Sequence, residues 1–237
     1  MPLPARRTLS AALAALLLAS SLHAVAGERE DERARNAVRV LTDIQAIPEN
    51  AIPDKLLDEA RAVVIVPDSI KAGLVVGGRR GHGLLSVKNP DGTWSNPTFV
   101  SLTGGSVGFQ AGVSSTDVVL VFRTQRGVDS IVNGKFTLGA DASAAAGPVG
   151  RSATASTDAQ LKAEIYSYSR SRGLFAGAAL DGSAITIDND ANQAVYGSGV
   201  TARRIFEGGV TAVPNPVVDF RDRLEEYTAE KQPEKQE

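Results

Sequence analysis

The sequence predicts a strand-rich α+β protein whose strongly curved antiparallel sheet is combined with short N-terminal helices and a C-terminal helix. Its 237 residues are 43% hydrophobic and 22% charged, as in an ordinary globular chain. Apolar residues recur at helical spacing only near the two ends of the chain. Between them, short runs rich in Val and Ile alternate with Gly- and Pro-containing turns, which predicts strands. The sheet is expected to be barrel-like or to form two packed sheets.

The first 26 residues have the form of a secretory signal peptide. Arg6 and Arg7 precede an apolar run over residues 9–19, and Ala24-Val25-Ala26 resembles a cleavage site. The run is shorter than the roughly 20 apolar residues of a transmembrane helix. We therefore expect export, a mature chain that begins at Gly27, and a location in the periplasm or elsewhere in the cell envelope.

A helix is expected over residues 28–45, because its apolar positions have the spacing of one helical face. Its acidic first turn suits the positive end of the helix dipole. Pro48 ends this helix, and Asn50 and Pro53 predict a second, short helix that runs to Arg61.

The middle of the chain is expected to consist of strands. Their predicted ranges are 63–66, 73–78, 83–88, 93–101, 106–112, 117–123, 135–139, 161–168, 173–179 and 183–187. The turn sequence at residues 89–92, Asn-Pro-Asp-Gly, predicts a hairpin, and Asp181-Gly182 is expected to join the last two strands in another. Residues 79–82, Arg-Arg-Gly-His, are expected to form a basic loop.

The predicted organisation has four parts. The signal peptide (1–26) precedes a helical segment (27–62), which forms one unit with the β-rich body (63–218), and a charged tail (219–237) follows. A helix near residues 217–229 is expected to lead into this tail.

A five-residue pattern with Gly at both ends recurs at residues 73–77, 108–112 and 173–177. Residues i and i+4 of a strand share one face, so each copy would place two glycines on the same side. Such glycines permit sharp curvature or the close approach of another backbone. The pattern therefore predicts three similarly bent strands.

The composition and motifs give little support for catalysis. Cysteine is absent and histidine occurs only at positions 23 and 82, which excludes disulfides, thiolate metal sites, a cysteine nucleophile and a lipoprotein's acylated cysteine. The Gly-x-Ser-x-Gly match at 104–108 has no histidine after it, unlike an α/β-hydrolase. The loose dinucleotide motif at 197–202 lacks room for a following βαβ unit. We expect no enzyme activity, no cofactor and no metal, and we expect Trp94 to fill the core.

Positive charge concentrates in the body of the predicted fold. Residues 63–151 hold eight basic and five acidic residues, whereas residues 27–62 and the tail are net acidic. The candidate lipid-binding residues flank two strands about 100 residues apart in sequence: Lys71, Arg79, Arg80, Arg170 and Arg172. Near an anionic bilayer each cation contributes roughly 1 kcal/mol. The alternative is an ordinary solvated surface.

Many short segments, taken in order, resemble the SYLF domain family, a lipid-binding module related to yeast actin-regulatory proteins of the Ysc type. They are Lys71-Ala72-Gly73, Gly81-His82-Gly83, Asp91-Gly92-Thr93-Trp94-Ser95, Gly104-Gly105-Ser106-Val107-Gly108, Thr137-Leu138-Gly139, Gly147-Pro148, the run from Tyr168 to Gly177, Asp181-Gly182-Ser183, Asn192 and Tyr196. The resemblance implies phospholipid binding without catalysis. In eukaryotic members the N-terminal amphipathic helix is basic, whereas here it begins Glu28-Arg29-Glu30-Asp31-Glu32.

The leading hypothesis is a non-catalytic envelope protein that binds anionic phospholipid headgroups, with no nucleic-acid partner and no access to actin because of export. An alternative is an envelope scaffold that binds a protein partner through its acidic helix and tail. A third is a hydrolase that uses carboxylates, for which the candidates are Asp68, Asp117, Asp141 and Asp181. Clustering of two of these in a pocket would favour that third hypothesis.

Overall fold

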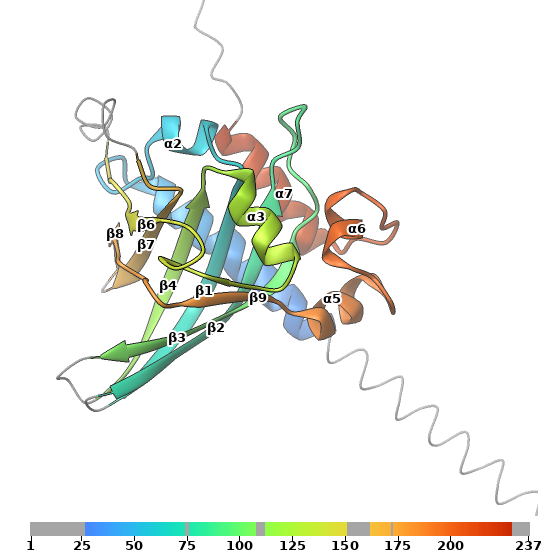
Figure 1. Cartoon of the computed structure of the whole chain (residues 1–237). Coiled ribbons are helices and arrows are strands. Elements are labelled where there is room, and N and C mark those ends of the chain that lie inside the picture. The colour runs from blue at the N-terminus through green and yellow to red at the C-terminus, as the bar shows by residue number, and fades with distance from the viewer. Residues whose placement is uncertain (1–26, 74–75, 108–111, 151–161, 172, 229–237) are drawn as a thin grey trace, which may run out of the picture.

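The computed structural model describes residues 27–73, 76–107, 112–150, 162–171 and 173–228. It confirms the strand-rich α+β class, as one strongly curled, open sheet with helices on both faces (Figure 1). The predicted signal peptide (1–26) and Arg172 lie outside the described residues.

The strands are β1 (Ala62–Gly73), β2 (Val76–Val87), β3 (Thr98–Val107), β4 (Gly112–Phe122), β5 (Lys135–Thr137), β6 (Ala144–Ala146), β7 (Ile165–Ser171), β8 (Leu174–Gly177) and β9 (Ala184–Ile187). The helices are the N-terminal helix (27–46), α2 (Asp54–Asp58), α3 (Gln125–Val132), α5 (Asn189–Tyr196), α6 (Ala202–Phe206) and α7 (Asn215–Thr228).

The sheet has the order β5-β9-β3-β2-β1-β4-β7-β6, and β8 pairs with β7 outside this path. The β6–β7 pair is parallel, and the other pairs are antiparallel. The turn at 89–92 connects β2 to β3, which confirms the hairpin predicted there. The hairpin predicted at Asp181-Gly182 is wrong, because β9 pairs with β3 and β5 rather than with β8.

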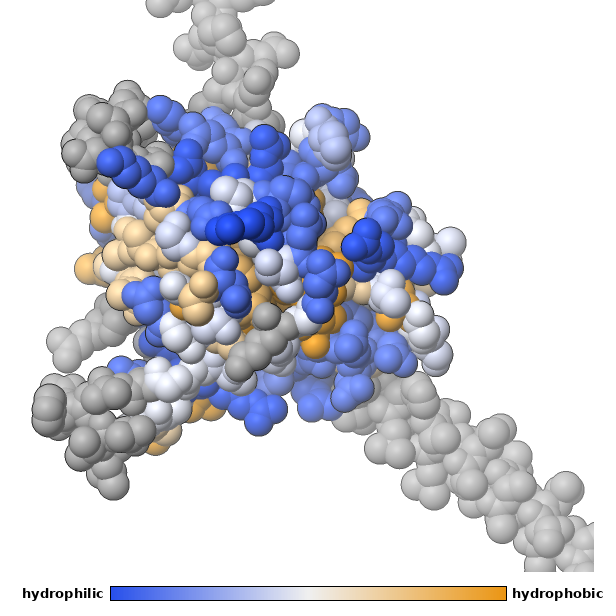
Figure 2. All heavy atoms as spheres, viewed as in Figure 1, coloured by the Kyte–Doolittle hydropathy of each residue, from blue (hydrophilic) through white to orange (hydrophobic). Residues whose placement is uncertain are grey.

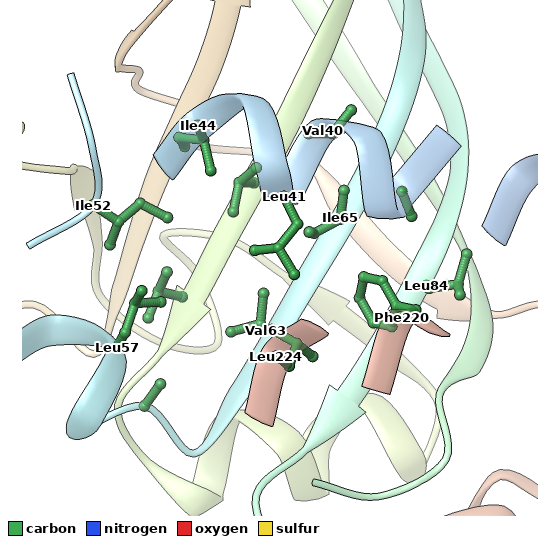
Figure 3. Packing of buried hydrophobic residues seen from close by; sticks show 14 of the residues in the cluster. Val40, Leu41, Ile44, Ile52, Leu57, Val63, Ile65, Leu84, Phe220 and Leu224 are labelled. Atoms are coloured by element: carbon green, nitrogen blue, oxygen red, sulfur yellow. The ribbon is translucent and has the colours of Figure 1, made fainter. Parts of the chain in front are cut away.

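The two faces of the sheet have separate hydrophobic cores. Side chains alternate along a strand, so the buried first half of β1 contributes to both. Val63 and Ile65 lie in the core beneath the N-terminal helix, α2 and α7 (Figure 3). Val64 and Val66 lie in the opposite core, with α3 and β5. This half of β1 is therefore inaccessible to any ligand.

The N-terminal helix shows the amphipathic pattern that its sequence predicts. Ala34, Ala37, Leu41 and Ile44 are buried in the core on this side. Its acidic first turn is not wholly displayed, since Glu30 is buried and pairs with Arg33 at 3.3 Å. The helix therefore offers less free negative charge than its sequence suggests.

The C-terminal helix extends the folded unit beyond the predicted tail boundary at residue 219. Phe220 and Leu224 are fully buried in the core on the N-terminal helix's side. Trp94 is buried, as predicted, and its Nε1 donates a hydrogen bond of 2.7 Å to Thr228 Oγ1. Residues 219–228 thus belong to the folded domain, because α7 supplies part of its core.

Several elements differ from the sequence prediction: strand β6 was not predicted, and β1 runs from Ala62 to Gly73 where separate strands at 63–66 and 73–78 were expected. Helices α3, α5 and α6 were not predicted. Residues 79–82 do not form a basic loop: they lie inside β2, which continues without a break from Val76 to Val87. Within the described residues, no helix is both long and apolar enough to cross a membrane.

Parts of two of the three glycine-bounded segments, residues 74–75 and 108–111, lie outside the described residues, so the bent strands predicted there stay a prediction. Of the described residues, Gly73 ends β1, Gly77 lies near the start of β2, Gly112 begins β4, and residues 174–177 form β8, which pairs with β7 in a hairpin. Gly173 has φ +88°, which glycine adopts without strain. The strand registers place the ends of β1, β3 and β7 and the starts of β2, β4 and β8 at the same end of the sheet, which we call the hairpin end.

Candidate functional site

Strands β1–β4 extend beyond the helices at the hairpin end and form a projecting arm (Figure 1). We define the arm as residues 69–73, 76–82, 103–107 and 112–116. In β4, Gly112–Ser115 are exposed, whereas Asp117–Phe122 are buried. The same strands therefore pass from a buried core into an exposed arm.

Large apolar side chains are exposed at the hairpin end. Val113 is 77% exposed, Leu174 57% and Ile70 54%, whereas the fourth large exposed apolar side chain of the described residues, Ile47, directly follows the N-terminal helix. Apolar residues also border the grey tip of the arm at the lower left in the space-filling view (Figure 2). Scattered exposed apolar residues are ordinary, but their concentration at one end marks a candidate contact surface.

The arm carries three of the predicted cations on two faces. Lys71 lies directly opposite Arg79 in the β1–β2 register, so both side chains emerge on one face. Arg80 lies opposite Ile70 and therefore emerges on the other face. The three cations share a level of the arm rather than a face.

Arg170 has a structural role that the sequence did not reveal. It lies opposite Asp117 in the β4–β7 register and forms ion pairs with Asp43 and, at 3.7 Å, with Asp117. Its guanidinium also lies 5.5 Å from the centre of the Phe175 ring. The structure thus separates Arg170 from the three arm cations, because its charge is already neutralised.

The candidate catalytic carboxylates form no open acid–base pair. Asp68 and Asp117 are neighbours, since the Asp68 amide donates a 3.0 Å hydrogen bond to Asp117 Oδ1, but Arg39 lies within 4 Å of both carboxylates. Asp141 accepts a bond from the Thr137 amide in a turn, and Asp181 lies in another turn. Among the described residues, no group of three or more acidic or histidine side chains could hold a metal.

A groove of about 610 Å³ separates the start of the N-terminal helix from the arm. Residues 78–82 of β2 form its floor, and Ile70, Arg29 and Arg33 also line it. His82 Nδ1 lies 3.3 Å from Asp188 Oδ2, which also lies 3.5 Å from Arg33 Nη1. His82 therefore helps to connect the sheet with the helix rather than decorating a loop.

Arg79 has unusual surroundings for an arginine on a projecting strand. Burial removes solvent from its guanidinium and lowers its pKa. Its Nη1 is buried and has no hydrogen-bond partner among the described residues. A buried donor without an acceptor is costly, so this side chain is a candidate for binding an external acceptor.

The fold and the hairpin end together define an α+β protein with one curled sheet and a cation-bearing projection. Residues 103–227 match the Ysc84 family, described as "Las17-binding protein actin regulator". The chain belongs to this family, which confirms the relationship that its ordered motifs predicted.

The chain is similar to curated relatives in yeast and human. It is 38% identical over 184 residues to LAS seventeen-binding protein 3 of Saccharomyces cerevisiae, which covers 76% of this chain and 39% of the relative. It is 37% identical over 169 residues to Protein YSC84 of the same yeast, with 70% and 36% covered. It is 31% identical over 202 residues to human SH3 domain-containing YSC84-like protein 1, with 84% and 58% covered. The chain thus spans less than two thirds of these relatives.

Proposed function

We propose that this protein binds anionic phospholipid surfaces with the hairpin end directed toward the membrane. One coincidence supports the proposal: the described structure has three of its four large exposed apolar side chains at the end that also carries Lys71, Arg79 and Arg80. No ion pair is described for these three cations, in contrast to Arg170. Apolar groups and free cations together are the usual requirements for peripheral membrane attachment.

End-on docking makes use of cations on both faces of the arm. Lys71, Arg79 and Arg80 lie two to four residues from the strand ends at Gly73 and Val76. At about 3.3 Å per residue, this places them roughly 7–13 Å from the reversal. The headgroup layer on each side of a bilayer is roughly 5–8 Å thick. The cations can therefore surround the arm at headgroup level while Val113, which lies opposite Ala72 and nearer the tip than all three, approaches the acyl boundary. Ile70 is level with Arg80 and stays in the headgroup layer.

The expected attachment is weak and sensitive to salt. Three cations contribute about 1 kcal/mol each near an anionic surface, and partial burial of two aliphatic side chains adds a few more. The total corresponds to dissociation constants between millimolar and micromolar. Salt screens the electrostatic part, since the Debye length is about 8 Å at physiological ionic strength.

We further propose that the protein acts without catalysis and in the cell envelope. The neutralised carboxylates support a binding role rather than a catalytic one. The basic, apolar and Ala-x-Ala features of residues 1–26 support export. Export would separate this protein from actin, whatever its relatives bind.

Vesicle flotation tests the proposed function. We expect the chain over residues 27–237 to float with phosphatidylglycerol-containing vesicles at low salt, and to be released by high salt or by neutral vesicles. The triple variant Lys71→Gln, Arg79→Gln, Arg80→Gln should reduce recovery at least about tenfold, since each cation contributes roughly 1 kcal/mol. A charge-matched control replaces the exposed residues Arg61, Lys162 and Arg203 by Gln. Equal losses in both triples, or equal recovery with neutral and anionic vesicles, would contradict the proposal.

A further inference from the structure

The face of the arm that carries Lys71 and Arg79 has an unbalanced arrangement of charge. The two residues are direct cross-strand partners, and such partners have Cβ atoms roughly 4.5–5.5 Å apart. Like charges in this position repel and destabilise a sheet. A bound anion between the two charged groups would offset this repulsion.

The neighbouring strand positions provide no acid that could balance this charge. The row that crosses the four arm strands at this level reads Gly104, Arg79, Lys71 and Ser114 from β3 to β4. In the next row of this face toward the tip, Gly73 has Gly77 of β2 on one side and Gly112 of β4 on the other. Small residues thus occupy the cross-strand positions beside the two cationic side chains, and none of them carries a negative charge.

Unpaired donors occur on the same face. Arg79 Nη1 is buried, and the described part of the chain offers it no hydrogen-bond partner. Ser69 and Thr116 are direct partners one row nearer the core, and their hydroxyl oxygens are also buried without partners. A tetrahedral oxyanion accepts several hydrogen bonds at once, and charge-assisted bonds from arginine are the strongest of these.

We propose that Lys71 and Arg79 form a binding site for a single phosphate group, with Ser114 at its edge. The site takes the phosphate of a lipid headgroup or of a soluble phosphate ester, because both present the same oxygens. Arg80 does not belong to this site, since it emerges on the opposite face of the arm. The inference deepens the proposed function and takes the phosphate chemistry of the ligand from it.

Titration with glycerol phosphate, monitored by ¹H–¹⁵N NMR at constant ionic strength, tests the site without a membrane. We expect saturable shifts of the backbone amides of Lys71, Arg79 and Ser114. Arg79→Gln should weaken binding about tenfold or more, as expected for loss of a charge-assisted hydrogen bond. Arg80→Gln is the matched control and should leave the titration unchanged. Equal weakening by both variants, or no saturable shift of the arm amides, would overturn the inference.

Thermal unfolding gives a second readout that does not depend on the ligand's source. In phosphate-free buffer at low salt, Lys71→Gln should raise the Tm by about 1–2 °C, because it removes the repulsion. Glycerol phosphate should raise the Tm of the wild type and not that of Lys71→Gln. A lower Tm for Lys71→Gln in phosphate-free buffer would overturn the inference.

The vesicle experiment separates this inference from the proposed function. If vesicles bind the wild type but glycerol phosphate produces no shift in the arm, the phosphate site is overturned and membrane binding stands. If glycerol phosphate binds and anionic vesicles do not, the site stands for a soluble phosphate ester and the proposed function fails.

Discussion

The two halves of strand β1 differ in almost every property. Residues 62–66 are fully buried on both faces, whereas Ile70 and Ala72 are exposed in the arm. Strand β4 repeats the contrast, with an exposed half at Gly112–Ser115 and a buried half that begins at Asp117. One pair of continuous strands thus serves both the core and the proposed binding surface.

The boundary between the halves is a β-bulge. The β1 register shifts between Ile65 and Ile70, and Asp68 has φ +48°, the only positive value among the non-glycine residues described. The Asp68 amide donates to Asp117 Oδ1, which holds this conformation. Bulges bend a strand and increase its twist, so this one redirects the chain from the core into the arm. The buried halves of β1 and β4 stabilise the fold, so the exposed halves in the arm can hold charged side chains that contribute little to folding.

The largest expected effect compares two isoleucines of β1. Ile65→Ala removes a fully buried side chain and should lower the free energy of unfolding by about 2–5 kcal/mol. Ile70→Ala, five residues further on, should change it by less than about 0.5 kcal/mol, because Ile70 is 54% exposed. Urea unfolding measures both. Similar losses would remove the distinction between core and arm.

Two glycines of neighbouring strands provide the next comparison. A Cβ at Gly83 would lie 2.0 Å from the Ile65 carbonyl oxygen, whereas a Cβ at Gly105 would contact nothing within 4 Å. Gly83→Ala should therefore destabilise the fold by at least about 1–3 kcal/mol, and Gly105→Ala should be neutral. The thermal midpoints of the two variants check this, and a stable Gly83→Ala variant would contradict the close packing of β1 on β2.

Arg170 and Arg80 also differ, because the first forms ion pairs beside the core and the second lies in the arm. Arg170→Gln leaves Asp117, which is buried, with a single arginine partner and should cost about 1–2 kcal/mol of stability. Arg80→Gln should leave stability unchanged and reduce vesicle binding. A loss of stability in Arg80→Gln, together with reduced vesicle binding and unchanged stability in Arg170→Gln, would contradict these roles.

The smallest effect concerns Tyr168 in the buried half of the sheet. Its hydroxyl donates a 3.0 Å hydrogen bond to the Pro148 carbonyl, so Tyr168→Phe should cost about 1 kcal/mol at neutral pH. Burial raises the pKa of the phenol above its ordinary value. The unfolded chain therefore ionises first, and this tyrosine's contribution is complete below about pH 10 and falls as the pH rises further. Denaturation at pH 8–11 should show a smaller alkaline loss for Tyr168→Phe; an unchanged loss would contradict this role.

The sequence predicted local features well. The spacing of Ala34, Leu41 and Ile44 gave the buried face of the N-terminal helix, and the turn residues at 89–92 gave the first hairpin. Helix α5 was missed although a signal was present, since Asp188 caps it by accepting a bond from the Ala191 amide. The capping residue could have located this helix.

The arrangement of the site depends on pairings that no local pattern contains. Lys71, Arg79 and Arg80 were predicted as a set, but only the β1–β2 register shows that the first two oppose each other and that Arg80 faces away. Arg170 finds Asp43 at a separation of 127 residues along the chain. The sequence identified the cationic residues. The strand register shows on which face of the arm each one lies, and the ion pair with Asp43 shows that Arg170 is neutralised.

The most direct test of end-on docking is to measure which position of the protein enters the membrane interface. Because the chain has no cysteine, one introduced cysteine gives a single site for a fluorescent label. An environment-sensitive fluorophore on Val113→Cys should shift to the blue with anionic vesicles, since this arm position enters the membrane interface. The same label on Ile47→Cys, an exposed apolar site away from the hairpin end, should not respond. A response at position 47 with none at position 113 would show that the protein meets lipid with another surface.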